Sequence, residues 1–172
     1  MSTTHPFTEH PSRRLAVTLP NDYAQTVADY ERLVPEFPAA AFADCATWQD
    51  HLDLVATAAP HHFMRYQQME MSPLMGVSGA AWNATHYLMG NHTIAARMFR
   101  HDPAVMLHAP LRTLLVEDPD GATTFVIDQP GLLFGSYGSA DISVVGRELD
   151  GYVGRLIELL GGEAPEVLSQ RG

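Results

Sequence analysis

Four histidines between residues 86 and 108 are the first side chains in this chain whose type and spacing indicate chemistry. Imidazole nitrogen is a common ligand of zinc, copper and haem iron. Seven methionines lie between residues 64 and 106, and a thioether beside an imidazole suits copper(I) or a haem iron. The candidate metal or haem ligands are His86, His92, His101 and His108. The neighbouring methionines are Met64, Met69, Met71, Met75, Met89, Met98 and Met106.

The same residues also fit an ordinary structural role. The sequence contains none of the motifs H-E-x-x-H, H-x-H, C-x-x-C or C-x-x-C-H, so no known metal signature is present. Histidines often lie at the surface or cap helices, and methionines often fill gaps in a core. The sequence therefore leaves two interpretations open. Either these residues bind a cofactor, which would be haem or a transition metal, or they are structural and the protein has no cofactor.

A second group of residues indicates a site for a small molecule. Gly90 and Asn91 stand where a strand is expected to end and helical turns to begin, so they present backbone N–H groups to an anion or simply cap the helix. The guanidinium of Arg112 suits a carboxylate ligand or a structural ion pair. We predict ligand contacts from Asn91, Met98, Arg112, Met69 and Met71.

Covalent catalysis has little support in this sequence. The only cysteine, Cys45, lies in an alanine-rich stretch with no adjacent base, which favours an inert thiol. The chain has no lysine, so a Schiff-base lysine is excluded. No G-x-S-x-G motif is present, and Gly131–Gly138 is expected to be a glycine-rich loop without the lysine of a phosphate loop. Catalytic residues therefore stay unknown.

Hydrophobic periodicity predicts the elements that must position these side chains. Strands are expected at 15–19, 84–89 and 111–117, the last joined to a return strand at 123–127 by the turn Asp118-Pro-Asp-Gly121. Helices are expected at 22–34, around 48–55, at 93–100 and at 141–160. Residues 61–75 fit either a strand or a helix.

This order of elements predicts an α+β fold of the β-α-β-β-β-β-α type, with helices packed on one face of a mainly antiparallel sheet. An extra helical insert is expected near residues 36–60. We expect one domain over residues 14–162, a flexible tail over residues 1–13 and a polar tail over residues 163–172.

Several short motifs in this region occur together in a known bacterial family. The run Tyr87-Leu-Met-Gly-Asn91, then Met98, Ala109-Pro-Leu-Arg112, Val116-Glu-Asp118 and Gly121 resembles the "domain of unknown function 302" family. The likeness extends over roughly residues 14–162, apart from the segment near 36–60. The resemblance implies a small β-α-β-β-β-β-α domain that is often dimeric, and it implies no activity.

The chain departs from the family pattern at four positions. His92 stands where members usually have proline, and His108 where they usually have an acidic residue. Ile127 replaces a common tyrosine, and Gln67 replaces an acid after the second strand. These differences favour the hypothesis that imidazoles have reshaped a cleft framed by Gly90-Asn91 and by segments 93–108 and 63–75.

Composition excludes several classes of partner. The chain has 172 residues, 46% of them hydrophobic, and a net charge of −10, so an ordinary globular domain is expected. An acidic chain without a basic stripe is not expected to bind nucleic acid or an anionic membrane surface. No apolar run is long enough to span a membrane, the N-terminal residues lack an apolar signal core, and a cytoplasmic location is expected.

The sequence therefore predicts a dimeric, cytoplasmic protein that binds a small molecule, haem or a metal in a cleft lined by histidine and methionine, with redox or small-molecule chemistry. Two alternatives stay open. One is a non-catalytic dimeric binding or interaction module without a cofactor. The other is a cofactor-free enzyme that uses a histidine as general base while Arg112 holds a substrate carboxylate.

Overall fold

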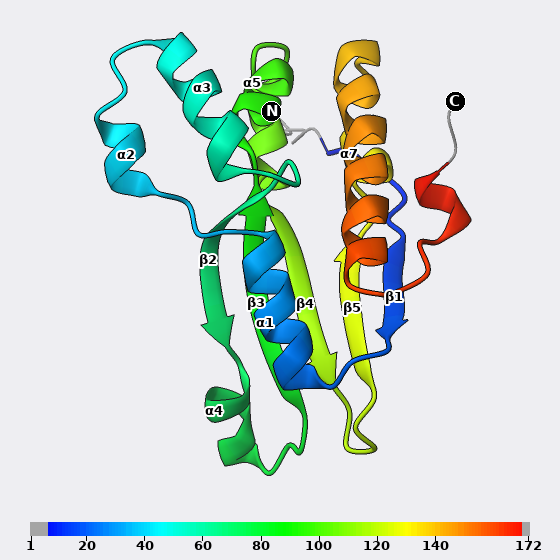
Figure 1. Cartoon of the computed structure of the whole chain (residues 1–172). Coiled ribbons are helices and arrows are strands. Elements are labelled where there is room, and N and C mark those ends of the chain that lie inside the picture. The colour runs from blue at the N-terminus through cyan, green and yellow to red at the C-terminus, as the bar shows by residue number, and fades with distance from the viewer. Residues whose placement is uncertain (1–6, 170–172) are drawn as a thin grey trace, which may run out of the picture.

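A five-stranded antiparallel sheet forms the frame of the molecule (Figure 1), which we describe from a computed structural model over residues 7–169. Its strands are β1 (Arg14–Leu19), β2 (Met64–Glu70), β3 (Asn83–Gly90), β4 (Leu111–Glu117) and β5 (Thr123–Asp128). They lie in the order β1-β5-β4-β3-β2. The α+β fold predicted from the sequence is confirmed, and the ambiguous residues 61–75 contain a strand followed by one helical turn.

Helices α1 (Tyr23–Leu33) and α7 (Ala140–Leu159) cover one face of the sheet (Figure 1). Each begins at a capping residue, because Asp22 and Ser139 accept hydrogen bonds from backbone N–H groups of the first turn. Apolar residues that alternate along the strands, such as Val17, Leu115 and Phe125, point toward these helices and form the core. We call the other side of the sheet the open face.

Tyrosine hydroxyls fix α1 on the sheet at two points. The Oη atom of Tyr30 lies 2.7 Å from Oγ1 of Thr113, and Oη of Tyr23 lies 2.6 Å from Oγ1 of Thr85. Tyr30 also packs on the ring of Tyr87 at a centroid distance of 4.5 Å. These pairs satisfy hydroxyl groups that would otherwise be buried without partners, so they set the position of α1 along the strands.

The remaining helices gather mainly at one end of the sheet (Figure 1). They are α2 (Ala39–Ala43), α3 (Trp48–Ala58), α5 (His92–Phe99) and α6 (Pro130–Gly135), with α4 (Ser72–Met75) at the other end. Three 3-10 turns complete the described chain: η1 (Gly76–Ser78), η2 (Pro103–Leu107) and η3 (Glu166–Leu168). The predicted helical insert near residues 36–60 is present as α2 and α3, and a capping box of Thr47 and Asp50 begins α3.

One sequence prediction about an irregular segment needs correction. The expected glycine-rich loop at 131–138 begins as helix α6, because Pro130 occupies its first turn and Phe134 is fully buried. The expected C-terminal polar tail folds back through η3, and Leu168 packs against α7 at Gly154. Near the N-terminus, Nη1 of Arg13 donates to Oε1 of Gln129 at 2.8 Å. Residues 1–6 and 170–172 of the predicted tails lie outside the described residues.

A buried carboxylate joins α6 to α7. Oδ1 of Asp150 accepts a hydrogen bond from the backbone N–H of Gly131 at 2.7 Å, and Oδ2 accepts one from Nε2 of Gln129 at 2.7 Å. Burial raises the pKa of Asp150, and these two hydrogen bonds oppose that rise. The helices meet closely at this point, because a Cβ atom at Gly131 would overlap Oδ2 of Asp150.

No helix within residues 7–169 is both long and apolar enough to cross a bilayer. The cytoplasmic location stays a prediction.

Substitution of Gly131 tests this contact. We expect Gly131→Ala to lower the free energy of unfolding by about 1–3 kcal/mol, because the new methyl group must displace the Asp150 carboxylate. The matched control is Gly151→Ala, one residue beyond Asp150 on α7, where the added Cβ meets no atom within 4 Å. This control should raise stability by about 0.5–1 kcal/mol. Urea denaturation of both variants measures the difference, and equal effects would contradict the proposed packing.

Candidate functional site

An apolar cavity of about 450 Å³ lies at the end of the sheet where β2 begins, β3 ends and β4 begins. Helix α5 supplies one wall through Ile94, Ala95, Ala96, Met98 and Phe99. Phe134 of α6 and Leu149 of α7 close another side, and the segment Ala109–Leu111 closes the end toward the open face. Parts of all three segments that the sequence predicts to frame a cleft therefore line this cavity.

The polar groups in the lining come from Tyr66, Asn91 and His92, together with the indole of Trp48. Asn91 is the N-cap of α5, and its Oδ1 accepts hydrogen bonds from the backbone N–H and the hydroxyl of Thr93. Its Nδ2 donates to the backbone carbonyl of His62 at 3.1 Å. The side-chain amide is thus engaged in holding the start of the helix, which agrees with the capping role considered from the sequence.

His92 is the centre of a chain of hydrogen bonds. Its Nδ1 atom lies 3.1 Å from Oη of Tyr66, and its Nε2 atom lies 3.1 Å from Nδ1 of His51 on α3. The same Tyr66 hydroxyl accepts a hydrogen bond from the backbone N–H of His92 at 3.1 Å. Both ring nitrogens of His92 are therefore engaged by protein groups.

Burial and the nearby imidazole of His51 lower the pKa of His92. Burial also raises the pKa of the Tyr66 hydroxyl, and the hydrogen bond from the His92 backbone opposes that rise. Both groups are consequently neutral near pH 7. The lining of the cavity thus carries no formal charge at this pH, because none of its other residues ionises.

The insert builds an aromatic wall beside His92. Phe37 stacks on Tyr66 with ring centroids 4.7 Å apart and on Phe42 at 4.8 Å. Phe42 meets the His92 ring edge-on at 4.7 Å, and the Trp48 indole lies 6.3 Å from it. Residues 36–60 therefore position His92 through ring contacts as well as through His51.

The structure separates the predicted ligand-binding residues. Met98 lines the cavity and is almost fully buried, and Asn91 lines it as the helix cap. Met69 lies on the open face of β2 with 40% of its surface exposed, and Met71 precedes α4 at the far end of the same strand. Arg112 points to the open face, where it lines a different hollow.

The four candidate metal ligands lie in different surroundings. His86 is on the open face of β3, and His92 is beside the apolar cavity. Nδ1 of His101 lies 3.7 Å from a carboxylate oxygen of Asp141, and the ring of His108 lies 5.9 Å from that of His10. Within residues 7–169, no three histidine, cysteine or acidic side chains are grouped as a metal ion requires.

A second hollow of about 460 Å³ lies on the open face at the start of β4. It is lined by His108 and Arg112, together with His10, Asp128 and several apolar residues. The alternative of a cofactor-free enzyme requires a histidine beside Arg112. His108 meets that requirement in this second hollow, whereas His92 lines a cavity to which Arg112 does not contribute.

Sequence analysis did not find Trp48, His51 and Tyr66 as site residues. Trp48 and His51 lie in the insert, about 40 residues before His92, and only the tertiary fold brings them there. Tyr66 sits at the irregular register between Arg65 and Gln67 in β2. This irregularity directs its ring toward the cavity, and the strand pattern alone contains no signal for it.

Comparison with known proteins gives a family and a fold. Residues 53–158 match the model of a family described as "Domain of unknown function DUF302". No curated protein matches the chain. The chain is similar to the crystal structure of the uncharacterized conserved protein DUF302 from Bacillus stearothermophilus, with 12% sequence identity and a TM-score of 0.64. The likeness covers 86% of this chain and 97% of that chain.

At this identity the structural likeness shows a shared fold and no shared activity. The family match is independent of it and spans more than half of the 172 residues. It includes α5, the strands β2 to β5, and most of the segments that line the cavity. The chain therefore belongs to the DUF302 family, as the motifs around Gly90-Asn91 and Pro110-Leu-Arg112 indicate.

Proposed function

We propose that the protein binds a small, uncharged, mainly apolar molecule in the cavity beneath α5. The observation that carries this proposal is the lining itself, in which methionine, aromatic and aliphatic side chains surround a space of about 450 Å³. Cavities that hold small molecules typically measure about 300–1,000 Å³ and have few polar groups. A charged ligand would lose its hydration there without gaining a partner of opposite charge.

The polar end of the cavity supports an uncharged ligand. The side-chain amide of Asn91 and both ring nitrogens of His92 already have hydrogen-bond partners within the protein. Apolar contact is therefore the main attraction that the lining offers, at roughly 25 cal/mol for each Å² of apolar surface removed from water.

A haem or a transition metal fits this cavity less well. An axial or metal-bound histidine needs a free ring nitrogen, and those of His92 are occupied by Tyr66 and His51. No arginine lines the cavity to neutralise the carboxylates of a haem. An absorption spectrum and metal analysis of the purified protein provide the direct check. A Soret band, or a metal near one per chain, would overturn the proposal in favour of these cofactors.

Filling the cavity tests the proposal. Ala96→Phe places a ring in the space beneath α5, and we expect it to weaken binding of the neutral dye N-phenyl-1-naphthylamine about tenfold or more, equivalent to about 1.4 kcal/mol. All proteins in this experiment also carry Trp82→Phe, so that Trp48, which lines the cavity, is the only tryptophan. Bound dye should then accept excitation energy from Trp48. Fluorescence titration gives both dissociation constants.

The matched control for this experiment is Ala56→Phe, which adds the same ring to an exposed position on α3. It should bind the dye as tightly as the parent protein. Equal weakening in both variants would show that the dye binds elsewhere. A parent protein that fails to bind the dye at all would contradict an accessible apolar cavity.

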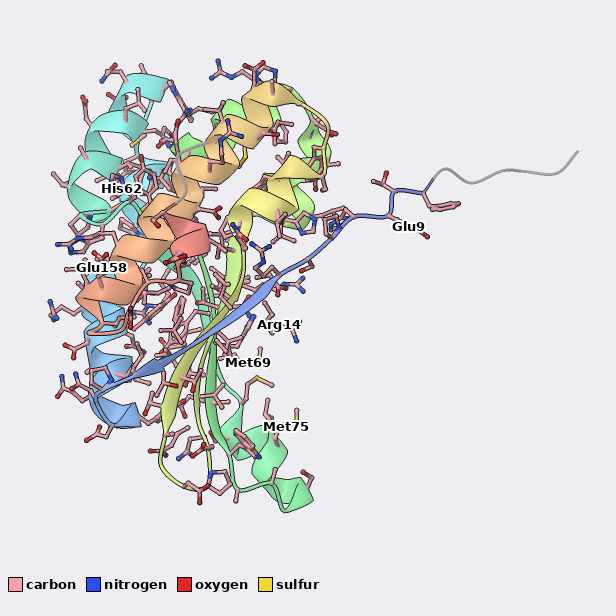
Figure 2. All side chains as sticks on the ribbon, turned by 90° about the vertical axis from the view of Figure 1, so that its right-hand side faces the viewer. Glu9, Arg14, His62, Met69, Met75 and Glu158 are labelled. Carbon is pink, nitrogen blue, oxygen red and sulfur yellow. The ribbon has the colours of Figure 1, made fainter. Side chains whose placement is uncertain are left out.

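We also propose that the chain forms a two-fold homodimer through an apolar arm, residues 72–82. The arm exposes 59% of Leu74, 52% of Met75, 90% of Val77 and 53% of Trp82. Figure 2 shows Met75 on the same side of the sheet as Met69, away from α7. Isolated proteins rarely expose so many large apolar groups together.

A second copy of the chain is the occupant that this geometry favours. The arm and the apolar centre of the open face, which includes Leu114, Val116 and Val126, belong to the same side of one molecule. Two copies related by a two-fold axis can each place the arm against the sheet of the other, and such reciprocal contacts are typical of two-fold dimers.

Introducing a charge on the arm tests the dimer. Val77→Asp should shift the protein from dimer to monomer in sedimentation velocity, because the carboxylate would be buried at the contact. Val144→Asp, at an exposed position on α7 on the other side of the sheet, should leave the dimer intact. A parent protein that sediments as a monomer at every concentration would refute the assembly.

A further inference from the structure

The hollow on the open face differs in chemistry from the apolar cavity, although the two share a wall. Pro110 and Leu111 line both spaces, which lie on opposite sides of this segment of the chain. The open-face hollow measures about 460 Å³ and combines charged, imidazole and apolar side chains. It lies at the start of β4, at the opposite end of the strands from the arm at residues 72–82.

The hollow is lined by one guanidinium, that of Arg112, and by one carboxylate, that of Asp128, which already has a partner outside the lining. Leu88 lies opposite Arg112 in the sheet register, and Arg14 lies opposite Asp128. On the antiparallel strands β4 and β5, Thr113 pairs with Ile127. The residues one step further, Arg112 and Asp128, therefore lie opposite each other. The carboxylate of Asp128 is engaged by Nε of Arg14 at 3.3 Å. One carboxylate therefore lies between two guanidinium groups.

Arg112 itself has no ion pair or hydrogen bond to another side chain within the described residues 7–169. Five other arginines each lie within 4 Å of an acidic side chain: Arg14, Arg32, Arg65, Arg97 and Arg155. Since the chain carries 20 acidic against 10 basic residues, acidic partners are abundant. An arginine left without one in a hollow has its planar fork of donors free for an external oxyanion.

Two imidazoles border this guanidinium. Burial lowers the pKa of His108, and so do the nearby His10 and Arg112, while Asp128 acts in the opposite direction. Burial and Arg112 likewise lower the pKa of His86, which lies on the open face of the adjacent strand β3. A bound anion would favour the protonated form of His108, which lines the hollow, so this imidazole can add a donor when the anion is present.

Apolar side chains complete the hollow. Leu107 is 76% exposed, and it lines the hollow together with Leu133 and the shared Pro110. A ligand that fits these surroundings has an apolar body beside its anionic group. Inorganic anions would use only the polar part of the lining.

From this arrangement we propose that the hollow around Arg112 binds a small organic anion, whose carboxylate or phosphate group pairs with the guanidinium while its apolar body packs on Leu107 and Leu133. His108 lines the same hollow and strengthens the site when it is protonated. This proposal does not depend on the proposed ligand of the apolar cavity.

Isothermal titration calorimetry with simple probes tests the site. Benzoate and phenyl phosphate carry the two anionic groups on the same ring, and benzyl alcohol is the neutral counterpart. We expect at least one anion to bind with an affinity that Arg112→Gln lowers. Benzyl alcohol can enter the apolar cavity, so any binding of it should be unchanged by Arg112→Gln. The relative affinities of the two anions show which group the hollow prefers. An equal effect of Arg112→Gln on benzyl alcohol and on the anions, or no binding of either anion, would overturn the proposal.

Arg112→Gln removes the charge and keeps a side chain of similar length. It should weaken anion binding about tenfold or more, as expected for loss of a charged hydrogen bond. Arg155→Gln is the matched control, because this exposed arginine lies on α7 and pairs with Glu158. Equal weakening in both variants would indicate a general charge effect and would refute the site.

Two further measurements separate this proposal from its alternatives. Benzoate keeps its charge across neutral pH, so the parent protein should bind it more tightly at about pH 6 than at about pH 8, where the imidazoles are neutral. His108→Asn should flatten that dependence, and an unchanged pH profile would remove His108 from the site. Arg112→Gln should still bind N-phenyl-1-naphthylamine normally, which shows that the variant is folded and that the two sites are independent.

Discussion

The buried carboxylate of Asp150 is the interaction on which the helical end of this molecule depends. Removing a carboxylate from water is unfavourable unless hydrogen bonds replace those lost, and here the backbone of Gly131 and the amide of Gln129 supply them. The two bonds hold α6 against α7, so that Phe134 and Leu149 meet above the end of the sheet. Gly146 on α7 permits the approach, since a Cβ there would lie 3.0 Å from Cβ of Phe134.

The transition from β3 to α5 provides the opposite side of the same cavity. A Cβ atom at Gly90 would lie 3.4 Å from Cβ of Pro110, so the absence of a side chain lets the segment 109–111 approach the end of β3. Asn91 then turns the chain into α5 by capping Thr93 and by donating to the His62 carbonyl. The cavity therefore results from two helix starts that are fixed by short polar contacts and then lined with apolar residues.

The sequence allowed the sheet and its covering helices to be predicted, because their signals are local. Alternation gives the strands around Val17 and Phe125, the turn at Asp118–Gly121 gives the hairpin, and Asp22 gives the start of α1. Helix α6 was missed because its glycines suggested a loop, whereas Gly131 is required by the close approach of Asp150. That requirement comes from a residue 19 positions away.

The candidate site was less predictable, since its geometry depends on which face of an element each residue occupies. His86, His92 and His108 are close in sequence, yet they lie in three different environments. His86 is on the open face of β3, His92 lines the apolar cavity at the start of α5, and His108 lines the hollow before β4. Asn91 and Met98, both predicted as ligand contacts, line the cavity because one caps α5 and the other lies two turns further along it. His51 and Trp48 were not predicted, because the insert that carries them joins the site only through ring packing on His92.

The two proposed sites are explained by one segment of chain. Residues Ala109–Leu111 have the apolar cavity on one side and the Arg112 hollow on the other, with Pro110 and Leu111 exposed to both. The resemblance to the family leads one to expect proline at position 92 and an acidic residue at position 108, where this chain has histidines. His92 lines the apolar cavity and His108 lines the Arg112 hollow. An acidic residue at position 108 would supply Arg112 with a partner across the hollow. With histidine there, the guanidinium keeps its donors free, as the proposed anion site requires.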